Sequence, residues 1–198
     1  MSVLNPYANW GTGSNSSNIP SIQGALPHVD FSGRSEPKWV TFTFAPQSGT
    51  DVLNSTVIDQ ERRARFYITT SIQNGIRTTI ISDSGRQPAA RIEWQGQPII
   101  ELRTHSNSIP RQYASQFVQV APDGRSKTMV VNNKHFQWTQ IPQEGVIRWN
   151  NISYNPSEPV GALYRTQGVV SLSIAPSAVA LGLLDIGILV AILFSASG

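Results

Sequence analysis

The chain has 198 residues, which allows one domain with a tail or two small domains. Hydrophobic residues make up 39% of it, enough for a packed core, whereas charged residues make up only 14%, below the roughly 25% usual in soluble proteins. The formal net charge is +3 and the arginines are scattered, which argues against nucleic acid as a partner. Because the chain has no cysteine, disulfides, thiolate catalysis and cysteine-based zinc sites are excluded.

The first part of the chain differs in composition from the rest. Residues 1–37 are rich in Ser, Asn, Gly and Pro and contain few aliphatic side chains. Such a segment buries too little apolar surface to offset its ordering entropy, so we expect a disordered leader over 1–37 and one folded domain over 38–198. The leader has neither a basic region nor an apolar run at its start, which predicts an intracellular, cytoplasmic protein and not a secreted one.

Short strands are predicted from residue 38 onward. Val40, Phe42 and Phe44 alternate with Thr and Ala residues, and the segment 63–70 alternates in the same way. A period of two is typical of half-buried β-strands. Further strands are predicted over 51–59, 76–80, 90–95, 98–102, 127–132, 135–139, 146–149, 151–154, 160–164 and 169–174.

Turn signals separate these strands. Asn74–Gly75 is typical of a type I′ hairpin turn, and Pro122–Gly124 carries Pro, Asp and Gly in the order that a β-turn favours. A further hairpin is predicted around Asn133–Lys134. Short strands at regular spacing indicate a β-sandwich or a β-barrel.

The C-terminal segment is apolar on every side. Residues 174–194 contain one charged residue, Asp185, and predict a continuous helix over 177–194 with Pro176 in its first turn. A helix of this kind is buried in a protein core or lies in a membrane, and its length is close to the roughly 20 residues that cross a bilayer. A central charge, and the lack of Lys, Arg, Trp or Tyr at its ends, favour a helix inside a β-barrel over a tail anchor.

Motifs for catalysis and for cofactor binding are missing from the sequence. His28, His105 and His135 are far apart and lack the spacing of metal ligands, and no nucleophile elbow, phosphate-binding loop or dinucleotide-binding pattern is present. We therefore predict a non-enzymatic protein with no cofactor and no metal site. The alternative is an enzyme whose unrecognised site lies at the mouth of the barrel, with Asp185 and a nearby Arg or His at its centre.

Four arginines are predicted to point outward on neighbouring strands. Arg63, Arg65, Arg77 and Arg91 would then form one basic face. Because arginine binds phosphate through two parallel hydrogen bonds, these residues are candidates for binding an anion or an acidic headgroup. The alternative is a solubilising surface whose arginines pair with neighbouring carboxylates such as Glu93.

Several segments occur in an order that resembles a known family. They are LNSTVIDQERRARFYITTS, IRTTIISDSGRQPAARIEWQGQPII, FQWTQ, PVGALYR, VVSLSIAP and LLDIGILVAILF. This order, which covers residues 40–194, resembles a fungal family of domains of unknown function in the tubby C-terminal-like superfamily, beside LURP-one-related proteins and phospholipid scramblases. The most specific pieces are the stretch from Asp83 to Trp94 and the C-terminal helix that contains Leu-Leu-Asp.

The resemblance implies a closed antiparallel β-barrel of about a dozen strands around a hydrophobic C-terminal helix. Asp185 would lie inside the barrel or near its mouth and would need hydrogen-bond donors or an arginine partner. Since tubby-type domains include phosphoinositide binders, the resemblance points to a binding or scaffold module. Its basic barrel face would recognise a phosphoinositide headgroup or a protein partner. The alternative is a tail-anchored or scramblase-like membrane protein with the last helix in lipid.

Overall fold

The computed structural model describes residues 39–49 and 51–196, so the leader predicted over 1–37 lies outside the described residues. Within them, thirteen strands form one antiparallel sheet. The strands are β1 (Val40–Pro46), β2 (Ser55–Ile58), β3 (Ala64–Gln73), β4 (Ile76–Asp83), β5 (Pro88–Trp94), β6 (Ile99–Arg103), β7 (Ser108–Tyr113), β8 (Gln119–Val120), β9 (Ser126–Val131), β10 (Lys134–Ile141), β11 (Val146–Asn151), β12 (Glu158–Thr166) and β13 (Val169–Ile174). The helices are α1 (Ala114–Phe117), α2 (Pro176–Ala180) and α3 (Leu183–Ala196).

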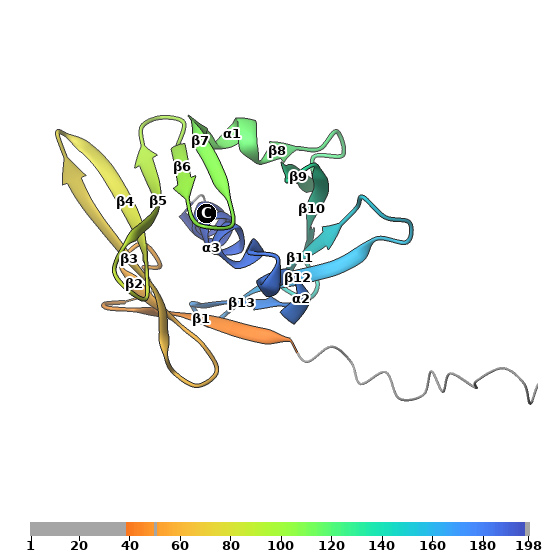
Figure 1. Cartoon of the computed structure of the whole chain (residues 1–198), viewed down its shortest axis with the longest axis horizontal. Helices are drawn as coiled ribbons and strands as arrows, with labels where there is room; N and C mark the ends of the chain where they lie inside the picture. Colours follow the sequence, from red (N-terminus) through yellow and green to blue (C-terminus); the bar gives the residue numbers. More distant parts are fainter. Residues whose placement is uncertain (1–38, 50, 197–198) are drawn as a thin grey trace, which may run out of the picture. The chain divides into compact units, whose positions relative to one another are not determined.

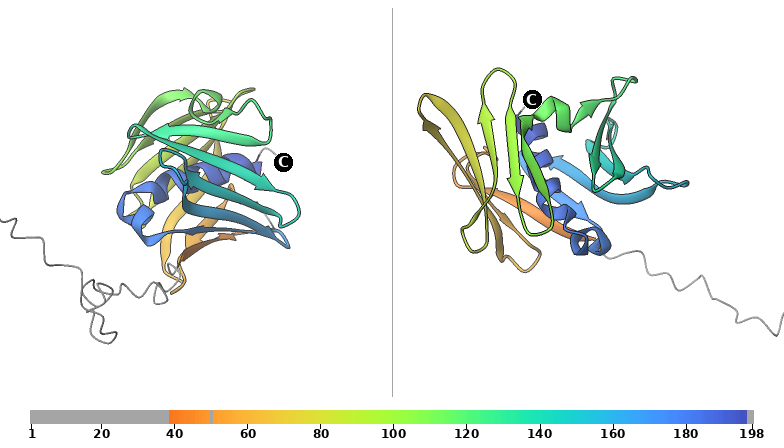
Figure 2. Two further views of the ribbon diagram at one scale, coloured as in Figure 1. Left: turned by 90° about the vertical axis from the view of Figure 1, so that its right-hand side faces the viewer. Right: turned by 45° about the horizontal axis from the view of Figure 1, so that its top comes forward.

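Most strands pair with their neighbours in the chain. The exception is the pair of β1 and β13, which brings the first and last strands together, so the sheet runs from β7 at one edge to β8 at the other. Figures 1 and 2 show the sheet curving around α3, which lies on its concave side. The predicted mainly β domain with a C-terminal helix is therefore confirmed.

The prediction of a closed barrel is wrong. β7 and β8 are the two edges of the sheet, and the described residues contain no ladder between them. β8 has only two residues, and β7 contains Pro110, which has no N–H to donate. The chain crosses between the two edges through α1 instead, and the side chain of Asn132 donates a hydrogen bond of 3.2 Å to Asn107 Oδ1 near the other end of β7.

The predicted alternation of side chains is largely confirmed. Phe42 and Phe44 of β1, and Phe66 and Ile68 of β3, are all buried. Several predicted boundaries are wrong, including the strand expected over 51–59, of which only Ser55–Ile58 forms β2. The β9–β10 turn consists of Asn132–Asn133, both with positive φ, one residue earlier than expected. Residues 152–157 form a loop, so the strand expected over 151–154 is the end of β11.

The turn between β3 and β4 agrees with its sequence signal. Asn74 has a φ of 51° and Gly75 a φ of 78°, as a type I′ turn requires at both central positions. Because this turn matches the right-handed twist of the strands, it sets the register of a hairpin in which Gln73 faces Ile76.

The C-terminal helix is interrupted, which corrects the continuous helix expected over 177–194. Gly182 has a φ of 75° and separates α2 from α3. A side chain at position 182 would place its Cβ 2.3 Å from Ser106 Cβ, so only glycine fits the approach of the β6–β7 loop. Asn107 Nδ2 donates a 2.7 Å hydrogen bond to the Gly182 carbonyl and fixes the break in place.

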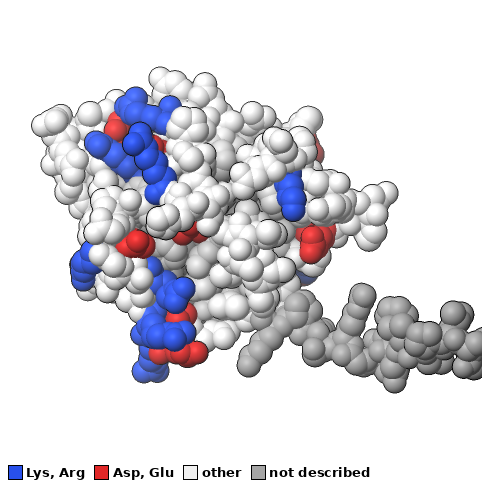
Figure 3. All heavy atoms as spheres, in the orientation of Figure 1, with Lys and Arg blue, Asp and Glu red and all other residues white. Residues whose placement is uncertain are grey.

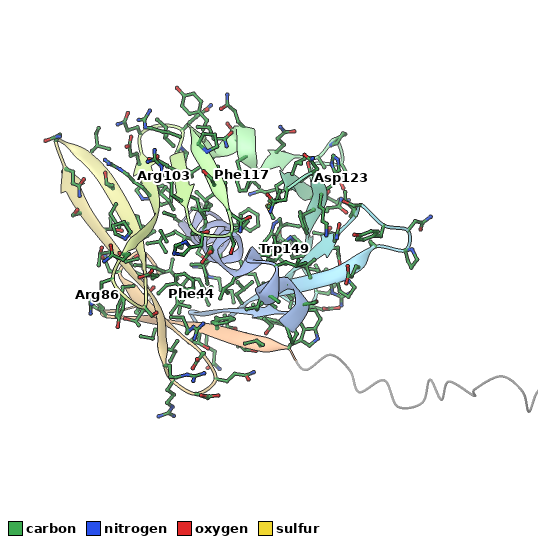
Figure 4. The ribbon with its side chains drawn as sticks, viewed as in Figure 1. Phe44, Arg86, Arg103, Phe117, Asp123 and Trp149 are labelled. Atoms are coloured by element: carbon green, nitrogen blue, oxygen red, sulfur yellow. The ribbon has the colours of Figure 1, made fainter. Side chains whose placement is uncertain are left out.

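The core of the molecule lies between α3 and the sheet. From Leu183 to Leu193, every α3 residue except Asp185 is buried. Gly187 lets the helix approach β11 and β13, because a Cβ there would lie 2.9 Å from Leu172 Cδ2 and 3.1 Å from Trp149 Cζ3. Figure 4 shows Trp149 beside the helix. The prediction that the helix is the core of the domain is therefore confirmed.

Within the part of the chain that the structure describes, none of the helices has both the length and the apolar character needed to span a membrane.

Candidate functional site

The predicted arginine face is divided into separate groups. Arg63 Nε lies 3.0 Å from Asp59 Oδ2, and its Nη2 lies 2.9 Å from Glu61 Oε2. The backbone N–H of Arg63 donates a hydrogen bond to Asp59, and this bond together with the ion pair holds the pKa of Asp59 below its usual value, although burial of the carboxylate acts in the opposite direction. Figure 3 shows two large clusters of Lys and Arg side chains in blue, and each of them contains Asp or Glu atoms in red. The positive charge of Arg63 is therefore already balanced.

Arg91 belongs to a second group on β5, β6 and β7. Its Nε lies 3.2 Å from Glu93 Oε1, and Arg111 Nη2 lies 2.7 Å from Glu93 Oε2. The hydrogen bond to Glu93 raises the pKa of Arg111 above its ordinary value. Since only 8% of Glu93 is exposed, the two guanidinium groups cover a buried carboxylate on the convex face of the sheet. For Arg91, the structure therefore agrees with the alternative that the outward arginines pair with neighbouring carboxylates such as Glu93.

Arg65 and Arg77 lie at opposite ends of the β3–β4 hairpin. Arg77 faces Ile72 across the ladder, and the seven positions from Arg65 to Ile72 span roughly 23 Å at about 3.3 Å per residue. Arg77 is also in phase with the buried Ile81, whereas Arg65 alternates with the buried Phe66, so the two arginines leave opposite faces of the sheet. The structure does not bring the four arginines together.

Asp185 lies in the first turn of α3, near the β6–β7 loop. Burial raises the pKa of its carboxyl group, a hydrogen bond with Thr104 opposes this, and the charge of Asp83 adds to the increase. Thr104, whose hydroxyl also lies 3.3 Å from the carbonyl oxygen of Asn107, is the polar group that acts on this carboxyl, and no arginine or histidine within residues 39–49 and 51–196 pairs with it. Nine residues of helix, roughly 14 Å, separate Asp185 from Phe194.

A pocket in the described residues lies at the other end of α3, and we call it the mouth pocket. It has a volume of about 580 Å³, and its wall comes from β9 to β13 together with the last turn of α3. The turns before β9, between β10 and β11 and between β12 and β13 all lie at this end of the antiparallel strands. Its lining therefore combines residues that are far apart in the sequence.

Strand register explains why basic and apolar side chains meet in the mouth pocket. Lys127 faces the buried Trp138 across the β9–β10 ladder, and Arg165 faces the buried Val170 across the β12–β13 ladder. Directly opposed residues point to the same side of a sheet, so both cations lie on the concave face. Arg125 precedes Lys127 by two positions and lines the same pocket.

The floor of the mouth pocket is apolar. Trp138 contacts Phe194 edge to face, with ring centres 5.5 Å apart, and Ile147 and Leu163 face each other across the β11–β12 ladder nearby. Ile147 and Phe194 are half-buried and pack against the core, so part of their apolar surface remains open to the pocket. The floor and the basic rim together give the pocket an amphipathic lining.

The positive charges of the rim have no acidic partner. None of the described lining residues is Asp or Glu, and Arg125, Lys127 and Arg165 make no ion pair within residues 39–49 and 51–196. Asp123, the carboxylate nearest in sequence, accepts hydrogen bonds from the backbone N–H groups of Ser126 and Arg125, which hold its pKa below the usual value. It is therefore committed to the turn before β9.

Lys127 lies at the boundary between rim and floor. Its Nζ is 4.2 Å from the centre of the Phe194 ring, a cation–π contact. Burial lowers the pKa of this ammonium group below its usual value. A partly desolvated cation that rests on an aromatic ring is suited to receive an anion, because the anion would restore the electrostatic stabilisation that water no longer supplies.

The buried indoles beneath the floor have a structural role. Trp138 and Trp149 stack with ring centres 4.6 Å apart, and neither indole N–H has a hydrogen-bond partner among the described residues. An unsatisfied N–H costs about 1–3 kcal/mol, whereas burying roughly 200 Å² of each side chain contributes about 5 kcal/mol. Packing therefore outweighs the lost hydrogen bonds, and both tryptophans belong to the core.

The rim of the mouth pocket was not predicted from the sequence. A signal was nevertheless present, because Lys127 lies in phase with Met129 and Val131 in a strand predicted from the outset. A charged residue at an inward-facing strand position indicates a site that water or a ligand reaches. The contribution of Arg165 depends on the β12–β13 ladder, which the sequence pattern does not specify.

No family model and no curated protein matches the chain. Among solved structures, an X-ray structure of a protein from Arabidopsis thaliana is similar to it, with a TM-score of 0.43 and 13% sequence identity over 76% of this chain and 90% of that chain. A likeness at this level supports no argument about function. The fold and the mouth pocket thus define a mainly β protein with a buried C-terminal helix and an amphipathic pocket.

Proposed function

We propose that the protein is a non-enzymatic binding module that takes an anionic small molecule into the mouth pocket. The observation that carries the proposal is the convergence of Arg125, Lys127 and Arg165 in a pocket without an acidic lining residue among those described. Charge-assisted hydrogen bonds from such groups bind carboxylates and phosphates, and a volume of about 580 Å³ is in the range of small-molecule sites.

The outer arginines are weaker candidates for the same role. Arg63 and Arg91 already pair with carboxylates, so an incoming phosphate would have to displace an existing partner. Arg65 is exposed and makes no ion pair within the described residues, but it stands apart from Arg77. The resemblance to the tubby C-terminal-like superfamily, which includes phosphoinositide binders, is consistent with an acidic ligand. In our proposal this ligand enters the mouth pocket.

A titration followed by nuclear magnetic resonance tests the proposal. We would add inorganic phosphate, and separately butyrate, to the ¹⁵N-labelled full chain and follow the backbone amide signals. We expect the largest shifts at residues 125–127 and at Arg165, because these surround the rim. Replacing one cation, as in Arg165→Gln or Arg125→Gln, should weaken binding about tenfold or more, since a hydrogen bond to a charged group contributes roughly 1.5–3 kcal/mol.

Arg65→Gln is the matched control, because it removes an exposed arginine far from the pocket lining. It should leave both titrations unchanged. If the shifts instead map to β3 and the surface around Arg65, and are lost in Arg65→Gln, the outer face is the anion site and the proposal for the mouth pocket is wrong. The same holds if neither anion perturbs residues 125–127.

A further inference from the structure

The mouth pocket also indicates the apolar half of its ligand. We infer that the ligand is a single-chain amphiphile, with one carboxylate or phosphate headgroup on an unbranched alkyl chain. This inference rests on the proposed function, which concerns only the anionic group, and it adds the part of the ligand that would lie on the pocket floor.

The composition of the floor favours a ligand with an apolar part. A site for a bare anion needs donors on all sides, whereas here Trp138, Ile147, Leu163 and Phe194 form one wall. The half-buried side chains Ile147 and Phe194 keep apolar surface open at the pocket. An alkyl chain lying on this surface would remove it from water, which a phosphate ion alone would not do.

The cation Lys127 and the apolar floor of the mouth pocket are in direct contact. Lys127 Nζ lies directly over the Phe194 ring, with 4.2 Å between them. A headgroup bound to this ammonium would therefore place the first atoms attached to it against Phe194 and the neighbouring floor. A headgroup joined directly to an alkyl chain has this arrangement, with charge and apolar surface separated by one bond.

The mouth pocket lies on the concave face of the sheet, which favours a detached ligand. The floor includes Phe194 in the last turn of α3 and residues of the neighbouring strands β10, β11 and β12, so the apolar surface lies within the curve of the sheet. A headgroup that remained part of a bilayer would reach the rim and leave this floor unfilled. A detached single chain can occupy rim and floor together.

Calorimetric titration of the full chain with a chain-length series tests the inference. The probes are butyrate, octanoate and laurate, each below its critical micelle concentration, and dodecyltrimethylammonium as a cation with the same chain as the longest probe. We expect affinity to rise about tenfold for every two methylene groups that enter the pocket, because each buried methylene contributes roughly 0.8 kcal/mol. Dodecyltrimethylammonium should not bind, because the rim repels it.

Matched variants separate the two halves of the site. Ile147→Gln should weaken laurate binding at least tenfold and leave butyrate within about twofold, because it alters the floor alone. Arg165→Gln should weaken both ligands, and Arg65→Gln should weaken neither. Circular dichroism would show whether each variant folds, and if Ile147→Gln does not, the chain-length series on the unmodified protein decides the question.

Three results would overturn the inference. Equal affinities for butyrate and laurate would show that the floor takes no chain, while the phosphate titration could still confirm the anion site. Binding to phosphatidylcholine vesicles containing phosphatidylserine that depends on Arg165, without binding of laurate, would identify a membrane surface as the ligand. Laurate binding that is unchanged in both Arg125→Gln and Arg165→Gln would contradict the proposed function as well.

Discussion

Two carboxylates with little exposure to water are stabilised in different ways. Glu93 has two arginine partners, whose guanidinium nitrogens lie within 3.2 Å of its oxygens. Asp185 has a hydrogen bond from Thr104 and a second carboxylate, Asp83, close enough to act on it. The first arrangement balances a buried charge, whereas the second leaves the charge of Asp185 without a counter-ion among the described residues.

The raised pKa of Asp185 makes a specific prediction about pH. A carboxyl group whose pKa is higher in the folded than in the unfolded state stabilises the fold at low pH, and this contribution is lost as pH rises through the folded pKa. Asp185→Asn removes the charge but retains an acceptor for Thr104. We therefore expect the variant to gain free energy of unfolding relative to the unmodified protein as pH rises from 4 to 7, measured by urea denaturation.

Glu144→Gln is a control for this pH series, because Glu144 is exposed and pairs with the exposed Arg148. Its free energy of unfolding should stay within about 0.5 kcal/mol of the unmodified protein. If the stability of Asp185→Asn ran parallel to that of the unmodified protein across the whole range, the burial of Asp185 would have no energetic consequence. If Asp185 were instead the centre of an active site, Asp185→Asn would abolish turnover and leave the free energy of unfolding unchanged.

At the scale of elements, close approach of backbones depends on a few small residues. In β12, a Cβ at Gly161 would lie 2.7 Å from the backbone oxygen of Ser173 and 3.3 Å from Trp149 Cε3. The first of these atoms belongs to β13 and cannot move without disturbing the ladder. Gly161→Ala should therefore lower the free energy of unfolding by about 1–3 kcal/mol, measured by urea denaturation.

Gly85→Ala provides the comparison for Gly161→Ala. At Gly85 the one close atom is Asp83 Oδ1, the end of a side chain in a surface turn, at 3.3 Å. We expect a change within about 0.5 kcal/mol, as for other surface substitutions. Equal losses in the two variants would show that the effect comes from the backbone freedom of glycine and not from the approach of β12 to β13.

Elements with a strong local pattern were predictable. β1, β3 and the turn at Asn74–Gly75 follow from alternation and turn chemistry, both of which act within a few residues. The break at Gly182 was missed because its cause, the contact with Ser106, joins segments far apart in the chain. The apolar run gave no local sign of it, since a single glycine is tolerated inside many helices.

At the scale of the whole molecule, composition and alternation predicted a mainly β domain around its last helix, but not the open edges of the sheet. Closure depends on whether β7 and β8 are long enough and free to pair, and Pro110 and a two-residue strand decide against it. The mouth pocket could not be predicted for a similar reason. Its rim joins β9 and β12, and only the complete order of strands brings Lys127 and Arg165 to one opening.

The stability of the whole domain should depend on α3, since the sheet curves around it. Leu189 has no exposed surface, so Leu189→Ala should lower the free energy of unfolding by about 2–5 kcal/mol, a large part of the 5–15 kcal/mol typical of a domain. Leu181→Ala removes the same atoms from a side chain that is 57% exposed, and should cost less than about 1 kcal/mol. Urea denaturation followed by tryptophan fluorescence compares the two. Similar small losses in the two variants would mean that the sheet folds without the helix. If the helix fills the core, truncating the fully buried Leu189 must lower the free energy of unfolding more than truncating the exposed Leu181.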